Sequence, residues 1–467
     1  MAANGGATDG VRARRDDPRA ADVADVADVA VVAGAPRLRG ELRLPGDKSI
    51  SHRALMLAAL AEGESRITGA GDGADVRSTA GILAALGVAV EQTRGEASNV
   101  DYRVVSAGHA ALARPVRDLD CGNSGTSLRL FAGILAGVPV TATLDGDDSL
   151  RRRPVARIIE PLRSMGAELH ARQDDSLPPL TVVGHAPLRP VDVSPTTPSA
   201  QVKSAILFAG LRADGRTSVR EAVATRDHTE RMLRARGIRV ETVPGEGAGV
   251  TVTIEGGGRV RALDERVPGD VSAAAFWLAA GAAHPDAELT IRGVGVNPTR
   301  RAVIDHLRAM GAHIEERATA ADDGTGEPVA DVTVRSSRLR GIDLGPSDVA
   351  AAIDEIPVLC VVAAVADGTT RIRGAGELRH KESDRIAGIA AGLRALGARV
   401  DVDGDDLTIR GGGRLTGAAT DSLGDHRLAM AFAVAGLLAT GTTSILGAGS
   451  AAVSYRGFFS ALEGVRA

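Results

Sequence analysis

Aromatic residues are scarce in this 467-residue chain: six Phe, two Tyr and one Trp make up 2% of it. So few rings argue against a platform on which nucleic-acid bases stack. Basic and acidic residues nearly balance, at 55 against 59, so no polybasic footprint for nucleic acid is expected. Lysine is scarcer still, because only Lys48, Lys203 and Lys381 contribute to the basic total and the other 52 are arginine. Three lysines kept in so arginine-rich a chain are candidates for a chemical role.

Cysteine and long apolar runs are also rare. Cys121 and Cys360 are too few for a disulfide framework or a cysteine zinc site, and no His, Asp or Glu group has metal-ligand spacing. We therefore expect no metal and no cofactor. No run of about 18 apolar residues is present, and the first 30 residues lack the apolar core of a secretory signal. A cytoplasmic protein with a disordered tail over 1–30 and no membrane partner is predicted.

One pattern recurs along the rest of the chain: a short β-rich run ending in glycine, a loop, an amphipathic helix, a glycine and another strand. The glycines that follow these helices are Gly87, Gly166, Gly237, Gly311, Gly397 and Gly464. Each glycine suits a left-handed residue after the end of a helix. The spacing of about 75 residues is too long for an ordinary solenoid. We predict an α/β chain (α+β repeats) of six units in two groups of three.

Polar residues gather where several apolar helices are expected to begin. The segments are LPGDKSISHRALMLAALAEG (44–63), DCGNSGTSLRLFAGILAG (120–137), SLRRRP (149–154) and PSAQVKSAILFAG (198–210). Helix N-termini favour anions, because their backbone N–H groups and dipole present positive charge. Serine caps and solvated charges are the plainer interpretation of each segment taken alone.

The C-terminal half repeats this arrangement with acidic residues. Asp354 and Glu355 precede the helix of AAIDEIPVLCVVAAVA (351–366), where they are either caps or a partly buried general base. Two further segments, RHKESDRIAG (379–388) and GDHRLAMAFAVAG (424–436), set arginine beside acidic groups at helix starts, where ion pairing on a solvated face is the alternative. Together the segments predict a site for a polyanionic small molecule.

With these motifs quoted, the chain resembles the 5-enolpyruvylshikimate-3-phosphate (EPSP) synthases, of the group called class II. The motifs lie in the family's order between residues 44 and 432. The resemblance implies two domains of three βαβαββ units each, with helix N-termini facing a cleft that closes around the ligands. The implied crossovers lie near 44–45 and 267–268. The upper domain would then span 44–267, and the lower would combine 31–43 with 268–467. A monomer is expected.

The implied reaction joins phosphoenolpyruvate to the 5-hydroxyl of shikimate 3-phosphate and releases phosphate. It belongs to the shikimate pathway, which leads through chorismate to the aromatic amino acids, and its enzyme is the target of glyphosate. By motif match, Asp354 takes the hydroxyl proton, Glu382 handles the proton at C3, and Lys48 contacts both substrates. The implied substrate-binding residues are Lys48, Ser49, Arg53, Gly125, Arg153, Ser199, Ala200, Gln201, Arg226, Asp354, Lys381, Arg385 and Arg427.

Two places depart from the family's pattern. Ala200 replaces a serine that contacts phosphate in other members, and Val453 and Arg456 stand where many members have a lysine and a proline near the C-terminus, so that Arg456 would have to replace the lysine. Two other functions remain open. One is enolpyruvyl transfer to UDP-N-acetylglucosamine, although the expected loop cysteine is absent near 146–154. The other is a non-catalytic protein on the same fold that binds anions or RNA.

Overall fold

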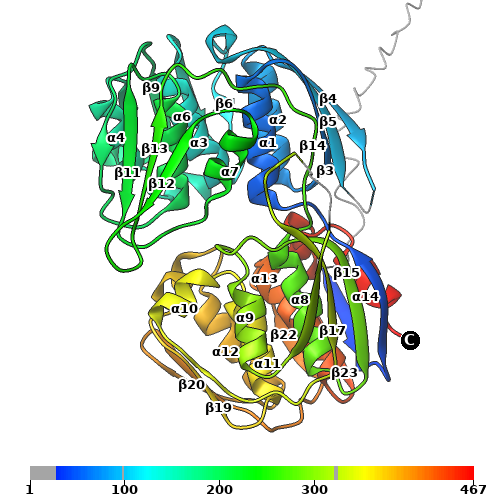
Figure 1. Cartoon of the computed structure of the whole chain (residues 1–467). Helices are drawn as coiled ribbons and strands as arrows, with labels where there is room; N and C mark the ends of the chain where they lie inside the picture. The colour runs from blue at the N-terminus through cyan, green and yellow to red at the C-terminus, as the bar shows by residue number, and fades with distance from the viewer. Residues whose placement is uncertain (1–27, 97–98, 320–323) are drawn as a thin grey trace, which may run out of the picture.

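The computed structural model describes residues 28–96, 99–319 and 324–467. The predicted tail therefore lies largely outside the described residues. Strand β1 (Val29–Ala33) already belongs to a sheet, because it pairs antiparallel with β23 (Thr442–Leu446). Strand β1 thus begins two residues before the predicted boundary at residue 31. Figure 1 shows two bodies of helices and sheets, one above the other.

One unit of the chain illustrates the repeated architecture. Its elements are β6 (Leu119–Asp120), α3 (Gly125–Ala136), β7 (Thr141–Asp145), α4 (Ala156–Ser164), β8 (Glu168–Ala171) and β9 (Leu177–Val183). The sheet order is β6-β7-β9-β8, in which the first pair is parallel and the other two pairs are antiparallel. This is a βαβαββ unit, as predicted, because a parallel pair needs a helical crossover whereas antiparallel strands join by short turns.

Four other sheets have the same order. The remaining elements of the upper body are α1 (Lys48–Leu60), β3 (Glu62–Ala70), α2 (Ala74–Ala85), β4 (Ala89–Arg94), β5 (Val100–Ala107), β10 (Asp192–Val193), α6 (Ala200–Gly210), β11 (Arg216–Glu221), α7 (His228–Ala235), β12 (Val240–Pro244), β13 (Val250–Glu255) and β14 (Glu265–Arg266). Those of the lower body are β2 (Leu38–Arg43), α8 (Val271–Ala283), β15 (Ala287–Gly295), α9 (Ala302–Ala309), β16 (His313–Ala318), β17 (Val329–Arg335), β18 (Asp343–Leu344), α10 (Pro346–Ala351), α11 (Ile356–Val365), β19 (Thr369–Ile372), α12 (Arg385–Ala395), β20 (Arg399–Asp403), β21 (Asp406–Arg410), β22 (Ala419–Asp421), α13 (His426–Leu438) and α14 (Phe458–Gly464).

The sixth unit departs from the prediction of six equal copies. Its sheet has three strands in the order β1-β23-β22, and the chain ends after α14 without a closing hairpin. Strand β1 covers the edge of β23 that the missing hairpin leaves open. An unpaired sheet edge is a template for aggregation, so this pairing completes the unit from the opposite end of the chain.

The two bodies exchange their first strands where the chain crosses between them. Strand β2 pairs parallel with β15 in the lower body, and β14 pairs parallel with β3 in the upper body. The sequence Pro-Gly-Asp occurs at both crossings, at 45–47 and 268–270. The amide of Asp47 donates to the carbonyl of Pro268 at 2.8 Å, and the amide of Asp270 donates to that of Pro45 at 3.0 Å. The two crossings therefore brace each other.

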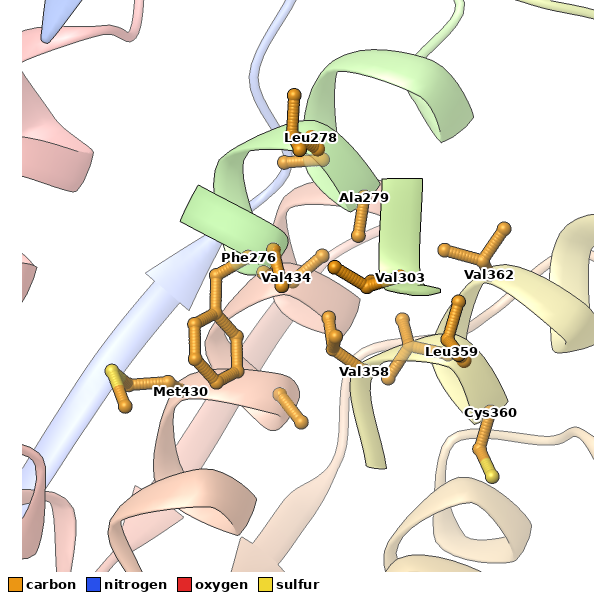
Figure 2. Packing of buried hydrophobic residues seen from close by; sticks show 14 of the residues in the cluster. Phe276, Leu278, Ala279, Val303, Val358, Leu359, Cys360, Val362, Met430 and Val434 are labelled. Carbon is orange, nitrogen blue, oxygen red and sulfur yellow. The ribbon is translucent and has the colours of Figure 1, made fainter. Parts of the chain in front are cut away.

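Two separate hydrophobic cores lie within these bodies. One is built from residues between 50 and 267, and the other from residues 32–44 and 271–465. Helices α8, α11 and α13 pack together in the second core, where Figure 2 shows Phe276, Val358 and Val434 meeting. These helices are apolar all round, which is the pattern of buried helices. Their first turns carry polar residues, and these turns build the site described next.

The predicted C-terminal glycines are confirmed in five of the six units. Their φ angles are positive and lie between 85° and 106° at Gly87, Gly166, Gly237, Gly311 and Gly397. The sixth prediction is wrong, because Gly464 is the last residue of α14. An isolated β-bridge between Arg466 and Leu38 follows it in place of a strand.

Candidate active site

Helices α1 and α3 begin with side-chain caps, which leave the neighbouring residues available for other contacts. Asp47 accepts a hydrogen bond from the amide of Ile50 at the start of α1, at 3.0 Å. Ser124 accepts from the amide of Ser127 at the start of α3, also at 3.0 Å. Capping satisfies amides that the first turn leaves without partners. Lys48 and Gly125 are the first residues of these helices, and capping is the task of their neighbours.

Asp354 lies where the two bodies meet. Its carboxylate is 3.2 Å from a guanidinium nitrogen of Arg226, which comes from the upper body. Within the lower body it lies 3.4 Å from Arg385 and 3.8 Å from the ammonium of Lys381. The structure therefore brings together four of the predicted residues, two of which are 128 positions apart in the chain.

The charges around Asp354 determine its ionisation. Burial opposes the charged carboxylate, but the positive charges of Lys381, Arg226, Arg427 and Arg385 outweigh it and hold the pKa of Asp354 well below its usual value. Asp354 is therefore ionised at neutral pH and is able to accept a proton. The nearby cations also make this place attractive to anionic ligands.

Arg385 links three acidic groups, which are Asp354 before α11, Glu382 before α12 and Asp425 at the start of α13. Its side chain is 1% exposed and lies 2.8 Å from Asp425 and 2.6 Å from Glu382. For Glu382, burial raises the pKa, but the charge of Arg385 is the largest opposing effect, and the pKa lies below its usual value. His426 itself is buried, and desolvation lowers its pKa to about 3. The ion-pair interpretation of these two motifs is correct, but the pairs are buried or half-buried instead of lying on a solvated face.

Glu355 does not cap α11, contrary to the capping interpretation, since no side-chain hydrogen bond closes that helix start. Its carboxylate instead accepts a hydrogen bond from the hydroxyl of Ser272 on α8. Arg427 lies 3.9 Å from the same carboxylate and donates to the carbonyl of Ser272 at 3.4 Å. Its position is thus fixed by two helices other than its own.

A second cluster surrounds the start of α3 in the upper body. Gln201 accepts a hydrogen bond from Arg129 at 2.8 Å and donates to the hydroxyl of Thr126 at 3.0 Å. A Cβ atom at Gly125 would lie 2.7 Å from a guanidinium nitrogen of Arg129 and 3.6 Å from one of Arg153. Gly125 therefore lies directly beside two cations, one of which is almost completely buried.

The sequence prediction missed Arg129. Burial, reinforced by the charges of Arg157 and Arg153, lowers its pKa to about 10. Its hydrogen bonds go to Gln201 and to two backbone carbonyls. The apolar stretch LRLFAGILA indicates that this helix is buried, but tertiary packing decides whether its arginine points inward.

The remaining predicted residues lie around these two clusters. Lys48 forms an ion pair with Asp75, whose carboxylate is almost fully buried. Arg53 is buried and donates to Thr229 at 2.7 Å and to Ser204 at 2.9 Å. Ser199 caps α6, of which Ala200 is the first residue, and the backbone of Ser49 accepts from Arg53. Among the described residues, no hydrogen bond or ion pair joins Lys48, Gly125, Arg153 or Gln201 to Asp354.

Arg456 contacts the upper body from the C-terminal segment. Its guanidinium lies 3.3 Å from the carboxylate of Asp72, which also pairs with Arg77 at 3.0 Å. Within the described ranges, no group of His, Cys, Asp and Glu could hold a metal ion. No helix in that same part of the chain is long and apolar enough to cross a membrane.

The fold and the charged site where the two bodies meet define a class of protein. The enolpyruvyl transferase NikO from Streptomyces tendae superposes with a TM-score of 0.73 over 94% of this chain and 97% of that one. At 22% identity this likeness establishes the fold. The chain therefore has the enolpyruvyl transferase fold, with two bodies of repeated units and charged helix starts where they meet.

The family follows from closer relatives. A family model described as EPSP synthase (3-phosphoshikimate 1-carboxyvinyltransferase) matches residues 32–462. A 3-phosphoshikimate 1-carboxyvinyltransferase from Gloeobacter violaceus is 51% identical over 93% of this chain and 98% of its own length, and one from Roseiflexus is 50% identical over 92% and 97%. An EPSP synthase structure from Acinetobacter baumannii has a TM-score of 0.84 and 38% identity over 94% of this chain and 98% of its own. The chain belongs to the EPSP synthase family.

Proposed function

We propose that this chain transfers the enolpyruvyl group of phosphoenolpyruvate to the 5-hydroxyl of shikimate 3-phosphate, with release of phosphate. Membership of the EPSP synthase family supports the activity. The structural observation that carries the assignment of the site is the ionised Asp354, which lies among Arg226, Lys381 and Arg385 where the bodies meet. Both proposed substrates are polyanions, and arginine guanidinium groups bind phosphate and carboxylate oxygens in a bidentate manner.

Asp354 is the proposed general base. It would take the proton of the 5-hydroxyl as the hydroxyl oxygen attacks C2 of phosphoenolpyruvate and C3 gains a proton. The C–O bond to phosphate then breaks as C3 loses a proton, so the double bond returns and phosphate leaves. A base with a depressed pKa is weak, but bound substrate anions would offset the surrounding cations and raise its pKa toward the range that catalysis requires.

Glu382 and Lys48 are the proposed partners at C3. Because Glu382 is ionised at neutral pH, its carboxylate is suited to remove the C3 proton in the elimination half. The ammonium of Lys48 carries protons, which suits it to supply one in the addition half. This division assigns the two half-reactions to different groups, and each group can be tested separately.

The proposed anion contacts fall into two sets. Gly125, Arg153, Arg385 and Arg427 would hold phosphoenolpyruvate, with Gln201 bridging to it. Ser49, Arg53, Ser199, Arg226 and Asp354 would hold shikimate 3-phosphate, with Lys48 touching both ligands and Lys381 beside Asp354. Ala200 offers no hydroxyl to that phosphate, which leaves the arginines a larger share of the binding.

Transfer to UDP-N-acetylglucosamine is the second candidate, and the cysteines count against it. Cys121 is completely buried, and burial raises the pKa of its thiol above the usual range. Cys360 is also buried, and its pKa is raised to about 12. A reactive cysteine needs a lowered pKa and exposure to substrate. Both thiols here are buried and have raised pKa values.

Phosphate release from phosphoenolpyruvate, measured separately with each acceptor, tests the proposal. We expect turnover with shikimate 3-phosphate and none with the nucleotide sugar, and the reverse result would refute the assignment. Asp354→Asn and Glu382→Gln should each lower kcat by about 10²–10⁴-fold, the range for general acid–base groups. Asp401→Asn is the matched control, because its carboxylate is 61% exposed and pairs with Arg410 on a surface strand pair.

We also propose that the chain acts as a monomer made of the two domains predicted from the sequence, 44–267 and 31–43 plus 268–467. Two separate cores with nearly the same limits support the division. Sedimentation equilibrium checks the oligomeric state. A cytoplasmic location and the lack of nucleic-acid and membrane partners stay predictions.

A further inference from the structure

Lys203, the retained lysine without a place in the proposed site, lies at the centre of a buried ion cluster. Its side chain is 1% exposed, and its ammonium is 2.8 Å from Glu221 on β11 and 2.7 Å from Glu230 on α7. A third contact, at 3.4 Å, goes to the backbone carbonyl of Thr225. One ammonium group therefore connects three elements of the upper body.

The geometry of this cluster requires lysine. An ammonium has three N–H donors on a single atom, and here it meets three acceptors from three directions. A guanidinium is longer and planar, and its donors form a rigid fork in one plane. Arginine in place of Lys203 would be forced out of line with at least one acceptor, in a position where Glu221 and Glu230 are both buried. This explains why a chain with 52 arginines has kept a lysine here.

The cluster holds the loop that carries Arg226. The carboxylate of Glu221 accepts hydrogen bonds from both the hydroxyl and the backbone amide of Thr225, the latter at 3.3 Å. Thr225 is thus fixed through its amide, its hydroxyl and its carbonyl. Arg226 follows directly, and its guanidinium reaches across to Asp354 at 3.2 Å. The direction in which Arg226 leaves the loop is therefore set by Lys203 and Glu221.

The same cluster supports Arg53 from the other side. Ser204, the residue after Lys203, and Thr229, the residue before Glu230, both accept hydrogen bonds from the guanidinium of Arg53. Their hydroxyls also contact each other at 2.7 Å. Burial lowers the pKa of Arg53 to about 10, and Glu230 contributes the largest opposing charge. Glu230 therefore balances both Lys203 and Arg53.

We propose that Lys203 is a positioning residue: with Glu221 and Glu230 it fixes Thr225, and through it Arg226 and Arg53, in the arrangement that receives shikimate 3-phosphate. The inference rests on the proposed function, because that function assigns shikimate 3-phosphate to these two arginines. In the part of the chain that the structure describes, Lys203, Glu221 and Glu230 form no hydrogen bond or ion pair with the side chains proposed for phosphoenolpyruvate. Its effect should therefore fall on one substrate and spare the other.

Thr225→Val is the sharpest test, because it removes the hydroxyl that Glu221 holds and leaves the buried charges paired. Loss of a hydrogen bond to a charged group corresponds to about a tenfold change or more. We expect the Kd and KM for shikimate 3-phosphate to rise about tenfold, while the KM for phosphoenolpyruvate stays within about twofold. Thr242→Val on β12 is the matched control, since its hydroxyl also meets a charged side chain, that of Arg234 on α7, and Thr242 takes no part in the Lys203 cluster.

Lys203→Arg tests the need for lysine while keeping the charge. We expect it to weaken shikimate 3-phosphate binding at least as much as Thr225→Val. An unchanged affinity would overturn the three-acceptor argument. If Lys203→Arg does not fold, Thr225→Val alone decides the proposal. Equal changes in the KM for shikimate 3-phosphate and in the KM for phosphoenolpyruvate would then refute the proposal, because they would indicate a merely structural role. If the wild-type protein is inactive when both substrates are present, the proposed function is refuted. If the wild type is active and Thr225→Val binds shikimate 3-phosphate as tightly as the wild type does, only this inference is refuted.

Discussion

Asp354 shows how strongly a single residue depends on charges from distant parts of the chain. Its pKa is depressed although burial alone would raise it, because Lys381, Arg226, Arg427 and Arg385 surround it. Substrate anions that pair with these cations offset part of their charge, so substrate binding should raise the pKa of Asp354. We predict that the Asp354 carboxyl titrates at higher pH with shikimate 3-phosphate and phosphate bound than in the free protein. Carboxyl ¹³C NMR checks this, with Asp354→Asn identifying the resonance, and a downward shift would contradict it.

At Gly125, a single added methyl group should weaken the binding of the inhibitor glyphosate more than the binding of phosphoenolpyruvate. Its added Cβ would lie 2.7 Å from Arg129, which must then move away from Gln201. Overpacking of this kind costs ~1–3 kcal/mol, so Gly125→Ala should raise the KM for phosphoenolpyruvate about tenfold. Glyphosate is longer than phosphoenolpyruvate, so its inhibition constant should rise by a larger factor. The wild type, which lacks this methyl group, should be inhibited well below millimolar concentrations.

The measurement is the ratio of the glyphosate inhibition constant to the KM for phosphoenolpyruvate in both proteins. A ratio that is unchanged or smaller in Gly125→Ala would contradict the steric argument. Gly81→Ala serves as the control, because a Cβ there meets nothing within 4 Å and Gly81 lies in α2, away from the site residues. Its kinetic constants should match those of the wild type.

At the scale of elements, two glycines distinguish the effect of backbone conformation on stability from the effect of available space. A Cβ at Gly81 or at Gly397 would meet nothing within 4 Å, but only Gly397 has a positive φ, of 89°. Gly81→Ala should therefore stabilise the protein by ~0.5–1 kcal/mol, through the helix propensity of alanine. Gly397→Ala should destabilise it by ~1–2 kcal/mol, because an L-residue is strained in the left-handed region. Urea unfolding of both variants measures the difference, and changes of equal sign would refute the explanation.

The same elements show what the sequence could predict. The period of the helices and the glycines after them, such as Gly311, follow from local rules, so the repeated unit was predictable. The pairing of β14 was not, because a two-residue strand carries no periodic pattern and its partner β3 lies about 200 residues earlier. The candidate site was likewise predictable only in part. Motifs predicted which residues gather, but the burial of Arg129 and the triad around Lys203 depend on tertiary packing.

At the scale of the whole molecule, the exchange of first strands makes the two bodies unequal. All strands of the three upper sheets, and the whole upper core, come from residues between 50 and 267. The lower sheets are different, because β1 and β2 come from the N-terminal side of the upper body. Cutting the chain at the second crossover would leave one body complete and take an edge strand from two sheets of the other.

A fragment of residues 44–267 should therefore fold alone, with cooperative thermal unfolding and dispersed amide resonances. A fragment of residues 268–467 should not fold alone, because it lacks β2, which pairs with β15, and β1, which pairs with β23. It would also expose the apolar core that Leu38 and Val32 cover in the whole chain. Adding a peptide of residues 28–43 to the second fragment should restore cooperative unfolding, since it supplies both strands. A peptide with Leu38→Asp and Val32→Asp is the matched control, and it should fail because it buries charge in the core. Independent folding of 268–467 without the peptide would show that the exchanged strands are dispensable, and would contradict the assignment of both to the lower domain.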